Sequence, residues 1–360
     1  MKRIDCKGII LLLLSFSLFL SAYSGDFDLK TNWRYTVQDP GGAGIPLPFP
    51  NSKNANSLII SGGKKVIRLG ASGNEMFSFI TSENVMVPAI GDLNGDGKSE
   101  IVISTSAGVI YCVDESGKLK WKCDLKDNLY DFGSAVLSDI DGDGKLESLF
   151  NARGGTIYCL NAEGTLRWKV LAEPRACNPA VGDIDGDGKA EIFFGTDVSK
   201  IFCLDYQGRY LWHTEILNGV YGRSSPTLAD LNGDGRYELI MPYSNTSPYP
   251  EIAVLDAHSG KLLWKGHTVM QNYGGTSVVD IDHDGKLDVI VVDKGNTVNA
   301  FNWDGQLKWQ TTLCGHGLFF AVGVADFFND GHFEIFASCR QTGPEGQTMF
   351  LLDEKGKVLR

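Results

Sequence analysis

Asp92-Leu93-Asn94-Gly95-Asp96-Gly97-Lys98-Ser99-Glu100 is the first of five copies of one acidic nine-residue loop. The second copy is Asp139-Ile140-Asp141-Gly142-Asp143-Gly144-Lys145-Leu146-Glu147, and the next three copies begin at Asp183, Asp230 and Asp280. A weaker sixth copy runs from Asp326 to Glu334. Successive first aspartates lie 47, 44, 47, 50 and 46 residues apart. A fixed period of this length predicts a repeat architecture with one loop in each repeat.

The loops have the composition of a site for a hard cation. Positions 1, 3, 5 and 9 carry oxygen side chains, and Ca²⁺ takes 6–8 oxygen ligands. Glycine at position 6 permits the sharp turn that such a loop needs. Position 7 offers its backbone carbonyl, and Leu or Ile at position 2 anchors the loop to the core. The predicted calcium ligands of the five loops are Asp92, Asn94, Asp96, Lys98 and Glu100; Asp139, Asp141, Asp143, Lys145 and Glu147; Asp183, Asp185, Asp187, Lys189 and Glu191; Asp230, Asn232, Asp234, Arg236 and Glu238; and Asp280, Asp282, Asp284, Lys286 and Asp288.

Two other interpretations of the loops fit less well than calcium. An EF-hand needs a bidentate Glu at position 12, but position 12 after Asp139 is Phe150, and the flanking segments have strand composition. Five acidic surface turns without a metal would crowd like charges together, which is unfavourable. The sixth loop has Phe328 at position 3, so we expect a weak or empty site there. The corresponding stretch at 49–57 has no carboxylate, and no metal is expected in it.

Each acidic loop lies inside a larger repeat of four short strands. A strand of small residues precedes the loop (Pro88–Gly91), and an apolar strand follows it (Ile101–Ser104). A third strand (Val109–Val113) leads through a turn glycine to a fourth strand with the pattern Gly-x-x-x-Trp. Four strands every 44–50 residues are typical of a β-propeller blade. The turn glycines count seven blades: Gly73, Gly117, Gly164, Gly208, Gly260, Gly305 and Gly356.

The fold class expected is therefore all-β, a seven-bladed propeller within one domain, residues 25–360. Blade 1 covers about 45–80 without a metal loop, and blades 2–7 start near 87, 134, 178, 225, 275 and 321. The seventh repeat has no Trp before the chain stops at Arg360, whereas residues 32–37, around Trp33, have the composition of a fourth strand without a blade before it. We predict that residues 32–37 complete blade seven, because an open ring would leave unpaired sheet edges. A truncated last strand is the alternative.

The acidic loop after a Gly-Asp strand resembles the FG-GAP/VCBS repeat, which is also found in the N-terminal propellers of integrin α-subunits. The Gly-x-Leu-x-Trp half, as in Gly164–Trp168, resembles the quinoprotein-like propeller repeat with its PQQ-type blades. Together these resemblances cover roughly residues 58–360. They imply a propeller and bound calcium, but the fold carries many activities.

The N-terminus predicts export. Lys2 and Arg3 precede an apolar run from Ile9 to Leu20, which is too short to span a bilayer and fits a signal peptide of residues 1–24, cleaved after Ser24. We therefore expect a secreted, periplasmic or cell-surface protein with no transmembrane segment. The net charge is −11, and the six acidic loops hold 21 of the 44 acidic residues. Nucleic acid and anionic membranes are poor partners for such a surface.

Cysteines give no strong indication of disulfides. Cys112, Cys159 and Cys203 occupy the same position of three consecutive blades, where we expect a small buried apolar residue. Equivalent positions in adjacent blades should be too far apart for a disulfide. Pairing among Cys123, Cys177, Cys314 and Cys339 stays open.

A ligand would find aromatic, Arg and Asn side chains on the face opposite the acidic loops, where the blade-to-blade connections lie. The same aromatic residues could instead simply plug the channel. The candidate ligand-binding residues are Tyr130, Phe132, Arg175, Tyr221, Arg223, Tyr273, His316 and Phe319.

Three functions fit this sequence. The first is a non-catalytic, calcium-stabilised module that binds an extracellular protein or glycan. The second is an enzyme, since similar propellers occur in rhamnogalacturonan lyases. A PQQ dehydrogenase fits less well, because that resemblance implies a Cys-Cys pair, which is missing here. The third is an envelope-assembly scaffold. No catalytic residue is predicted, and the oligomeric state is left open.

Overall fold

The computed structural model describes residues 47–49, 57–129, 134–173, 176–196, 200–215, 225–243, 251–269, 275–313, 322–338 and 349–359. Every regular element in these ranges is a β-strand. The chain divides into two compact units, Met1–Leu171 and Ala172–Arg360, and each is described here by itself.

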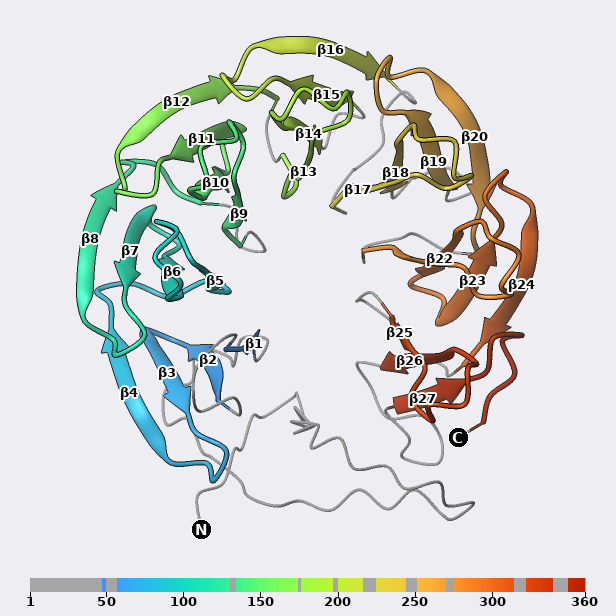
Figure 1. Cartoon of the computed structure of the whole chain (residues 1–360), viewed down its shortest axis with the longest axis horizontal. Coiled ribbons are helices and arrows are strands. Elements are labelled where there is room, and N and C mark those ends of the chain that lie inside the picture. Colours follow the sequence, from blue (N-terminus) through green and yellow to red (C-terminus); the bar gives the residue numbers. More distant parts are fainter. Residues whose placement is uncertain are drawn as a thin grey trace. The chain divides into compact units, whose positions relative to one another are not determined.

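Three four-stranded antiparallel sheets make up the described part of the first unit (Figure 1). Within each sheet the strands follow chain order, so that each pairs with the next along the chain. The first sheet holds β1 (Leu47–Pro48), β2 (Leu58–Gly62), β3 (Lys65–Leu69) and β4 (Glu75–Ile80); the second β5 (Ala89–Gly91), β6 (Glu100–Ser104), β7 (Val109–Val113) and β8 (Leu119–Asp124); the third β9 (Val136–Ser138), β10 (Glu147–Asn151), β11 (Thr156–Leu160) and β12 (Leu166–Leu171).

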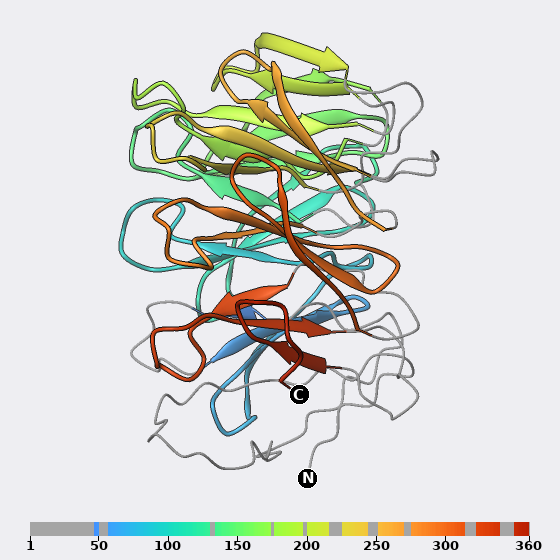
Figure 2. The ribbon, with the colours of Figure 1, turned by 90° about the vertical axis from the view of Figure 1, so that its right-hand side faces the viewer.

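The second unit repeats this arrangement in three four-stranded sheets and one sheet with three described strands. Figure 2 shows the last sheets of this unit, in gold, orange and red, following one another. They hold β13 (Ala180–Gly182), β14 (Glu191–Gly195), β15 (Lys200–Leu204) and β16 (Tyr210–Glu215); β17 (Thr227–Ala229), β18 (Glu238–Tyr243), β19 (Glu251–Asp256) and β20 (Leu262–His267); β21 (Ser277–Val279), β22 (Asp288–Val292), β23 (Thr297–Phe301) and β24 (Leu307–Thr312); and β25 (Gly323–Ala325), β26 (Glu334–Ser338) and β27 (Met349–Leu352).

The sheets pack face to face through their second and third strands. Those strands are covered on both faces: all five residues of β6 are buried, as are all five of β10. One core cluster joins Val102 and Ile110 of one sheet to Phe150 and Leu160 of the next, within the first unit. An equivalent cluster joins the sheets of β21–β24 and β25–β27 in the second unit. Within each unit, neighbouring blades therefore share a core, as a repeat protein requires.

Within each unit, Trp side chains of the fourth strands hydrogen bond to the following blade. Trp121 Nε1–H donates to the Ala162 carbonyl oxygen (2.9 Å), and its ring covers Gly164, where an added Cβ would lie 2.5 Å from ring atoms. Gly164 also has φ +79°, a conformation that disfavours side chains. In the second unit the indoles of Trp212, Trp264 and Trp309 donate in the same way to the following blade.

The recurring cysteines lie opposite these tryptophans. Cys112 pairs with Trp121, Cys159 with Trp168 and Cys203 with Trp212. All three thiols are fully buried, and these cysteines are free. A small residue at this position leaves room for the indole across the ladder. The expectation of a buried apolar position without a disulfide is confirmed for these three residues.

The number, order and packing of these sheets define an all-β, seven-bladed β-propeller fold, as the repeat predicts. Residues 32–37 with Trp33, and the signal peptide, lie outside the described residues. At the other end, Val358 bridges Leu352, and Leu359 N–H donates to the Leu351 carbonyl (2.8 Å), so a fourth strand begins beside β27. Counting from Gly356 places the Trp position of this repeat at Arg360 itself, and not beyond the end of the chain.

Candidate metal centres

The acidic loops all connect the first and second strands of a blade. The loop from Asp92 to Glu100, for example, leaves β5 at Gly91 and enters β6 at Glu100. The short first strand and the long buried second strand fix the two ends of the loop. Adjacent loops are also linked: Leu146 N–H donates to Leu93 O (3.0 Å) in the first unit, and Leu287 N–H to Leu231 O (2.8 Å) in the second.

The carboxylate at position 1 organises each loop by accepting backbone hydrogen bonds. In the second loop, Asp139 accepts from the N–H groups of Asp143 (3.1 Å) and Gly144 (2.9 Å). The position 5 carboxylate then accepts from the position 7 N–H, as Asp143 does from Lys145 (2.8 Å). The sixth loop keeps both features around Asp326 and Asp330. These bonds wrap the backbone of the loop around the position 1 carboxylate.

The carboxylate at position 9 fastens the end of each loop to its beginning. Glu100 Oε2 accepts from Leu93 N–H (3.0 Å), and the same position 9 to position 2 bond recurs in the other five loops. Position 9 is buried in all six loops, and its second carboxylate oxygen takes no part in this bond. The apolar anchor at position 2 is buried in Leu93, Ile140, Leu231 and Ile281, as expected, and half-buried in Ile184.

Three loops bring the carboxylates of positions 1, 3 and 9 together. Within each group the ligand atoms lie within 4.8 Å of one another. The aspartates at position 5 are not members of these groups. The groups are Asp139, Asp141 and Glu147; Asp183, Asp185 and Glu191; and Asp280, Asp282 and Asp288. These clusters can hold a metal ion.

The first and fourth loops differ because position 3 is Asn. The Asn94 amide donates to Asp96 Oδ2 (3.2 Å), and its oxygen accepts from Asp96 N–H (3.2 Å). Asn232 and Asp234 make the same pair of bonds at 3.0 and 2.9 Å. The amide oxygen can still serve as a neutral ligand, so these loops carry one negative charge fewer.

The electrostatics of the loops favour a cation. Burial raises the pKa of Glu147, Glu191 and Glu238, and the backbone N–H donor at position 2 opposes this only in part. Around Glu191, the charges of Asp183, Asp185 and Asp187 raise that pKa further. A nearby positive charge relieves both the desolvation and the repulsion.

In three loops, a Lys or Arg side chain of the protein already lies beside the position 9 carboxylate. It comes from the residue just before the fourth-strand Trp. Lys308 Nζ lies 2.6 Å from Asp282 Oδ2 and 2.7 Å from Asp288 Oδ1. Burial alone would lower the pKa of Lys308, but its bonds to these two aspartates outweigh that effect and raise it. Arg167 pairs in the same way with Asp141 (2.6 Å) and Glu147 (2.8 Å), and Lys120 with Glu100 (2.6 Å).

The blades of the third and fourth loops have no basic residue at that position. Leu211 and Leu263 stand there instead. The five loops therefore fall into two classes, three with a cationic side chain of the protein beside position 9 and two without. The sequence shows this difference at the residue before the fourth-strand Trp, which is basic in three blades and leucine in two. Only the structure shows that this residue contacts the acidic loop.

All eight candidate ligand-binding residues on the blade-to-blade connections fall outside the described residues, as do Cys314 and Cys339. The structure therefore brings together the carboxylates of positions 1, 3 and 9 in three of the loops, and the ligand face stays a prediction.

Comparison with family models supports the class of repeat. Residues 139–194, 183–241 and 280–337 match the FG-GAP-like repeat. Residues 65–131 match the lambda-carrageenase beta-propeller domain. The chain thus carries FG-GAP-like repeats within a β-propeller, which confirms the resemblance drawn from the acidic loops.

Solved structures agree on the fold. The chain is similar to Sqt1 of Saccharomyces cerevisiae, with 12% identity, a TM-score of 0.65, and coverage of 84% of this chain and 82% of that chain. It is also similar to the computationally designed Ika8 protein (13% identity, TM-score 0.63, 89% and 88% covered) and to a europium-containing methanol dehydrogenase (11% identity, TM-score 0.59, 80% and 72% covered). Such low identities show the fold alone. Among curated proteins, none matches the sequence.

Proposed function

We propose that this chain is an exported, non-catalytic FG-GAP-type propeller whose acidic loops bind calcium and whose connection face binds an extracellular glycan or protein. The observation that carries the calcium assignment is the convergence of positions 1, 3 and 9 within 4.8 Å in three loops. All donors are hard oxygens, which suit Ca²⁺ or Mg²⁺.

Calcium is favoured over magnesium by the kind of site that the loops form. Mg²⁺ demands near-ideal octahedral geometry and keeps several waters, whereas Ca²⁺ accepts flexible sites with more protein oxygens. Each loop offers three or four side-chain oxygen ligands and a backbone carbonyl at position 7. Millimolar extracellular calcium would fill sites of the modest affinity typical of such modules. The expected signal peptide is consistent with this habitat. In the described part of the chain, no helix is long and apolar enough to cross a membrane.

A glycan is the better supported of the two ligands. Residues 65–131 match a model named for the propeller domain of a lambda-carrageenase, a polysaccharide-degrading enzyme. The match concerns a propeller domain, so it supports polysaccharide recognition without requiring catalysis in this chain. The candidate connection residues include aromatic rings, Arg and His, which suit sugar binding through stacking and hydrogen bonds.

A glycan array with the full chain tests this proposal, run in calcium and again in excess EGTA. We expect retention of a polysaccharide in calcium, weakened by EGTA, with no new reducing ends. Tyr130→Ala should weaken retention. Tyr237→Ala, which removes an exposed ring from the fourth acidic loop, is the matched control and should not. Bond cleavage would support the lyase-like alternative, and a chain that retains no glycan in calcium would contradict the glycan assignment.

A further inference from the structure

We propose that His283, His332 and Glu354 form a binding site for one transition-metal ion, with Zn²⁺ as the reference ion, through side chains that are not among the predicted calcium ligands. The three residues belong to two neighbouring blades of the second unit. His283 is position 4 of the fifth loop, between β21 and β22, and His332 is position 7 of the sixth loop, between β25 and β26. Glu354 lies in the turn after β27.

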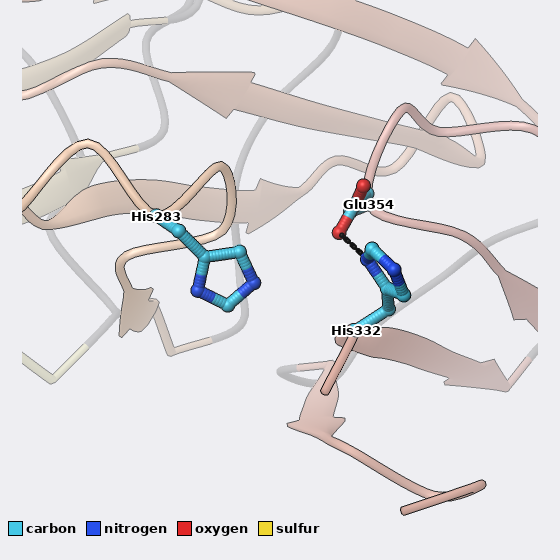
Figure 3. A group of neighbouring side chains, drawn as sticks. All are labelled: His283, His332 and Glu354. Atoms are coloured by element: carbon cyan, nitrogen blue, oxygen red, sulfur yellow. Dashed lines mark hydrogen bonds and ion pairs between the residues drawn. The ribbon is translucent and has the colours of Figure 1, made fainter. Parts of the chain in front are cut away.

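The three side chains converge on one point (Figure 3). One ligand atom from each residue lies within 4.8 Å of the other two. His332 Nδ1 and Glu354 Oε2 are 3.1 Å apart. Tetrahedral zinc with bonds of 2.0–2.1 Å holds its ligand atoms roughly 3.3 Å apart. The His332–Glu354 pair is therefore already at metal-binding separation. The exposed His283 ring needs to move closer by about 1–2 Å, which is the difference between the roughly 3.3 Å of a zinc site and the upper limit of 4.8 Å in the structure.

The surrounding contacts hold these ligands in place. The carbonyl of Glu354 accepts the indole N–H of Trp309 (2.9 Å), and Gly356 N–H donates to Asp353 O (2.9 Å), so the turn that carries Glu354 is fixed. The His283 ring stacks on Phe333, with 5.4 Å between centroids and 19° between planes. Held ligands bind a metal ion better than free ones because less freedom is lost on binding.

The backbone at His283 has a left-handed conformation that favours glycine. In the first four loops position 4 is Gly, with φ between +74° and +77°. The fifth loop keeps that left-handed conformation with a histidine, φ +58°, and the sixth keeps it with Asn329, φ +53°. A non-glycine residue there costs about 1–2 kcal/mol. An unfavourable residue beside a second histidine and a carboxylate points to a role that glycine cannot perform.

The donor set selects the class of ion. Two imidazole nitrogens and one carboxylate oxygen are poor ligands for Ca²⁺, which prefers oxygen alone. They suit Zn²⁺, whose sites with three protein ligands leave a fourth position for water. Position 7 is Lys or Arg in the first five loops and histidine only in the sixth, so a metal-repelling side chain is replaced by a metal ligand at this one place. A bound ion would tie the sheet of β21–β24 to the sheet of β25–β27.

Zinc titration by calorimetry tests the proposal, on the full chain with millimolar calcium present so that the acidic loops are filled. We expect one zinc ion per chain. His283→Gly and His332→Ala should each weaken zinc binding at least about tenfold. Loss of a residue that only hydrogen bonds to a metal ligand already costs about that much affinity, and loss of a ligand should cost no less. His283→Gly restores the glycine of the other loops, so it should fold at least as well as the parent.

His258→Ala is the control, because His258 is exposed on the turn after β19, in a different blade. Its zinc affinity should be that of the parent. Co²⁺ gives a second readout: the parent should show the intense visible absorption of a four-coordinate site, and His332→Ala should lose it. Unchanged zinc affinity in both His283→Gly and His332→Ala, or no zinc binding at all, would overturn the assignment.

Discussion

Excess EGTA should lower the melting temperature of the full chain by about 5–15 °C relative to 2 mM calcium. Five sites that bind only the folded chain each add RT ln(1 + [Ca²⁺]/Kd) to its stability. With Kd of ~0.1–1 mM, typical of extracellular modules, each site contributes roughly 0.5–2 kcal/mol. Each of the five loops leads into a fully buried strand, and adjacent loops hydrogen bond to one another, so the loss is transmitted to the blades.

Thermal melts followed by circular dichroism measure this difference. Returning calcium should restore the original melting temperature, whereas the same concentration of magnesium should restore it only in part, because Mg²⁺ tolerates these flexible cages less well. A melting temperature that is the same in EGTA and in calcium would exclude calcium as a stabilising ligand.

Lys308→Leu should make the stability of the chain depend more strongly on calcium. Without the ion, Lys308 is the countercharge of Asp288, whose side chain is only 2% exposed. Removing one partner of a largely buried pair leaves an uncompensated charge, at a cost of about 1–3 kcal/mol at this partly exposed site. With calcium bound, the ion itself supplies the countercharge. We therefore expect a large loss of stability in EGTA, a small loss in calcium, and roughly tenfold tighter calcium binding at the fifth loop.

The reciprocal change is Leu211→Lys, which places an ammonium at the equivalent position beside the third loop and should weaken calcium binding there. Lys355→Leu, on an exposed turn, is the control and should leave both properties unchanged. Equal destabilisation of Lys308→Leu in EGTA and in calcium would show that the lysine does not compete with the ion.

Most of this fold can be predicted from the sequence because the same four-strand pattern recurs several times along the chain. The period of the acidic loops and the glycine before each Trp place the strands, and the structure puts Trp121 on Gly164 of the following turn as a blade requires. The buried position 2 anchors and the cysteines opposite tryptophan follow from the same repetition. A residue type that recurs at the same position of several repeats has a structural role, whereas a single occurrence can be coincidental.

Features that occur once, or that depend on contacts between two repeats, cannot be predicted from the repeated pattern. The approach of His283 to His332 and Glu354 depends on how two neighbouring blades pack, because the three residues lie 49 and 22 positions apart along the chain. The pairing of Lys308 with Asp282 depends on which way a long side chain turns from the fourth strand. The connection residues, such as Tyr273 and His316, lie in segments whose length and sequence vary from blade to blade, so the repeat sets no conformation for them.

Counting the bound calcium ions tests the central claim most directly. Equilibrium dialysis or calorimetry on the full chain should give five ions, from the loops that begin at Asp92, Asp139, Asp183, Asp230 and Asp280. Asp141→Ala removes the position 3 ligand of the second loop and should give four, with the other sites unchanged. A chain that binds no calcium, or an Asp141→Ala variant that still binds five ions, would contradict the account.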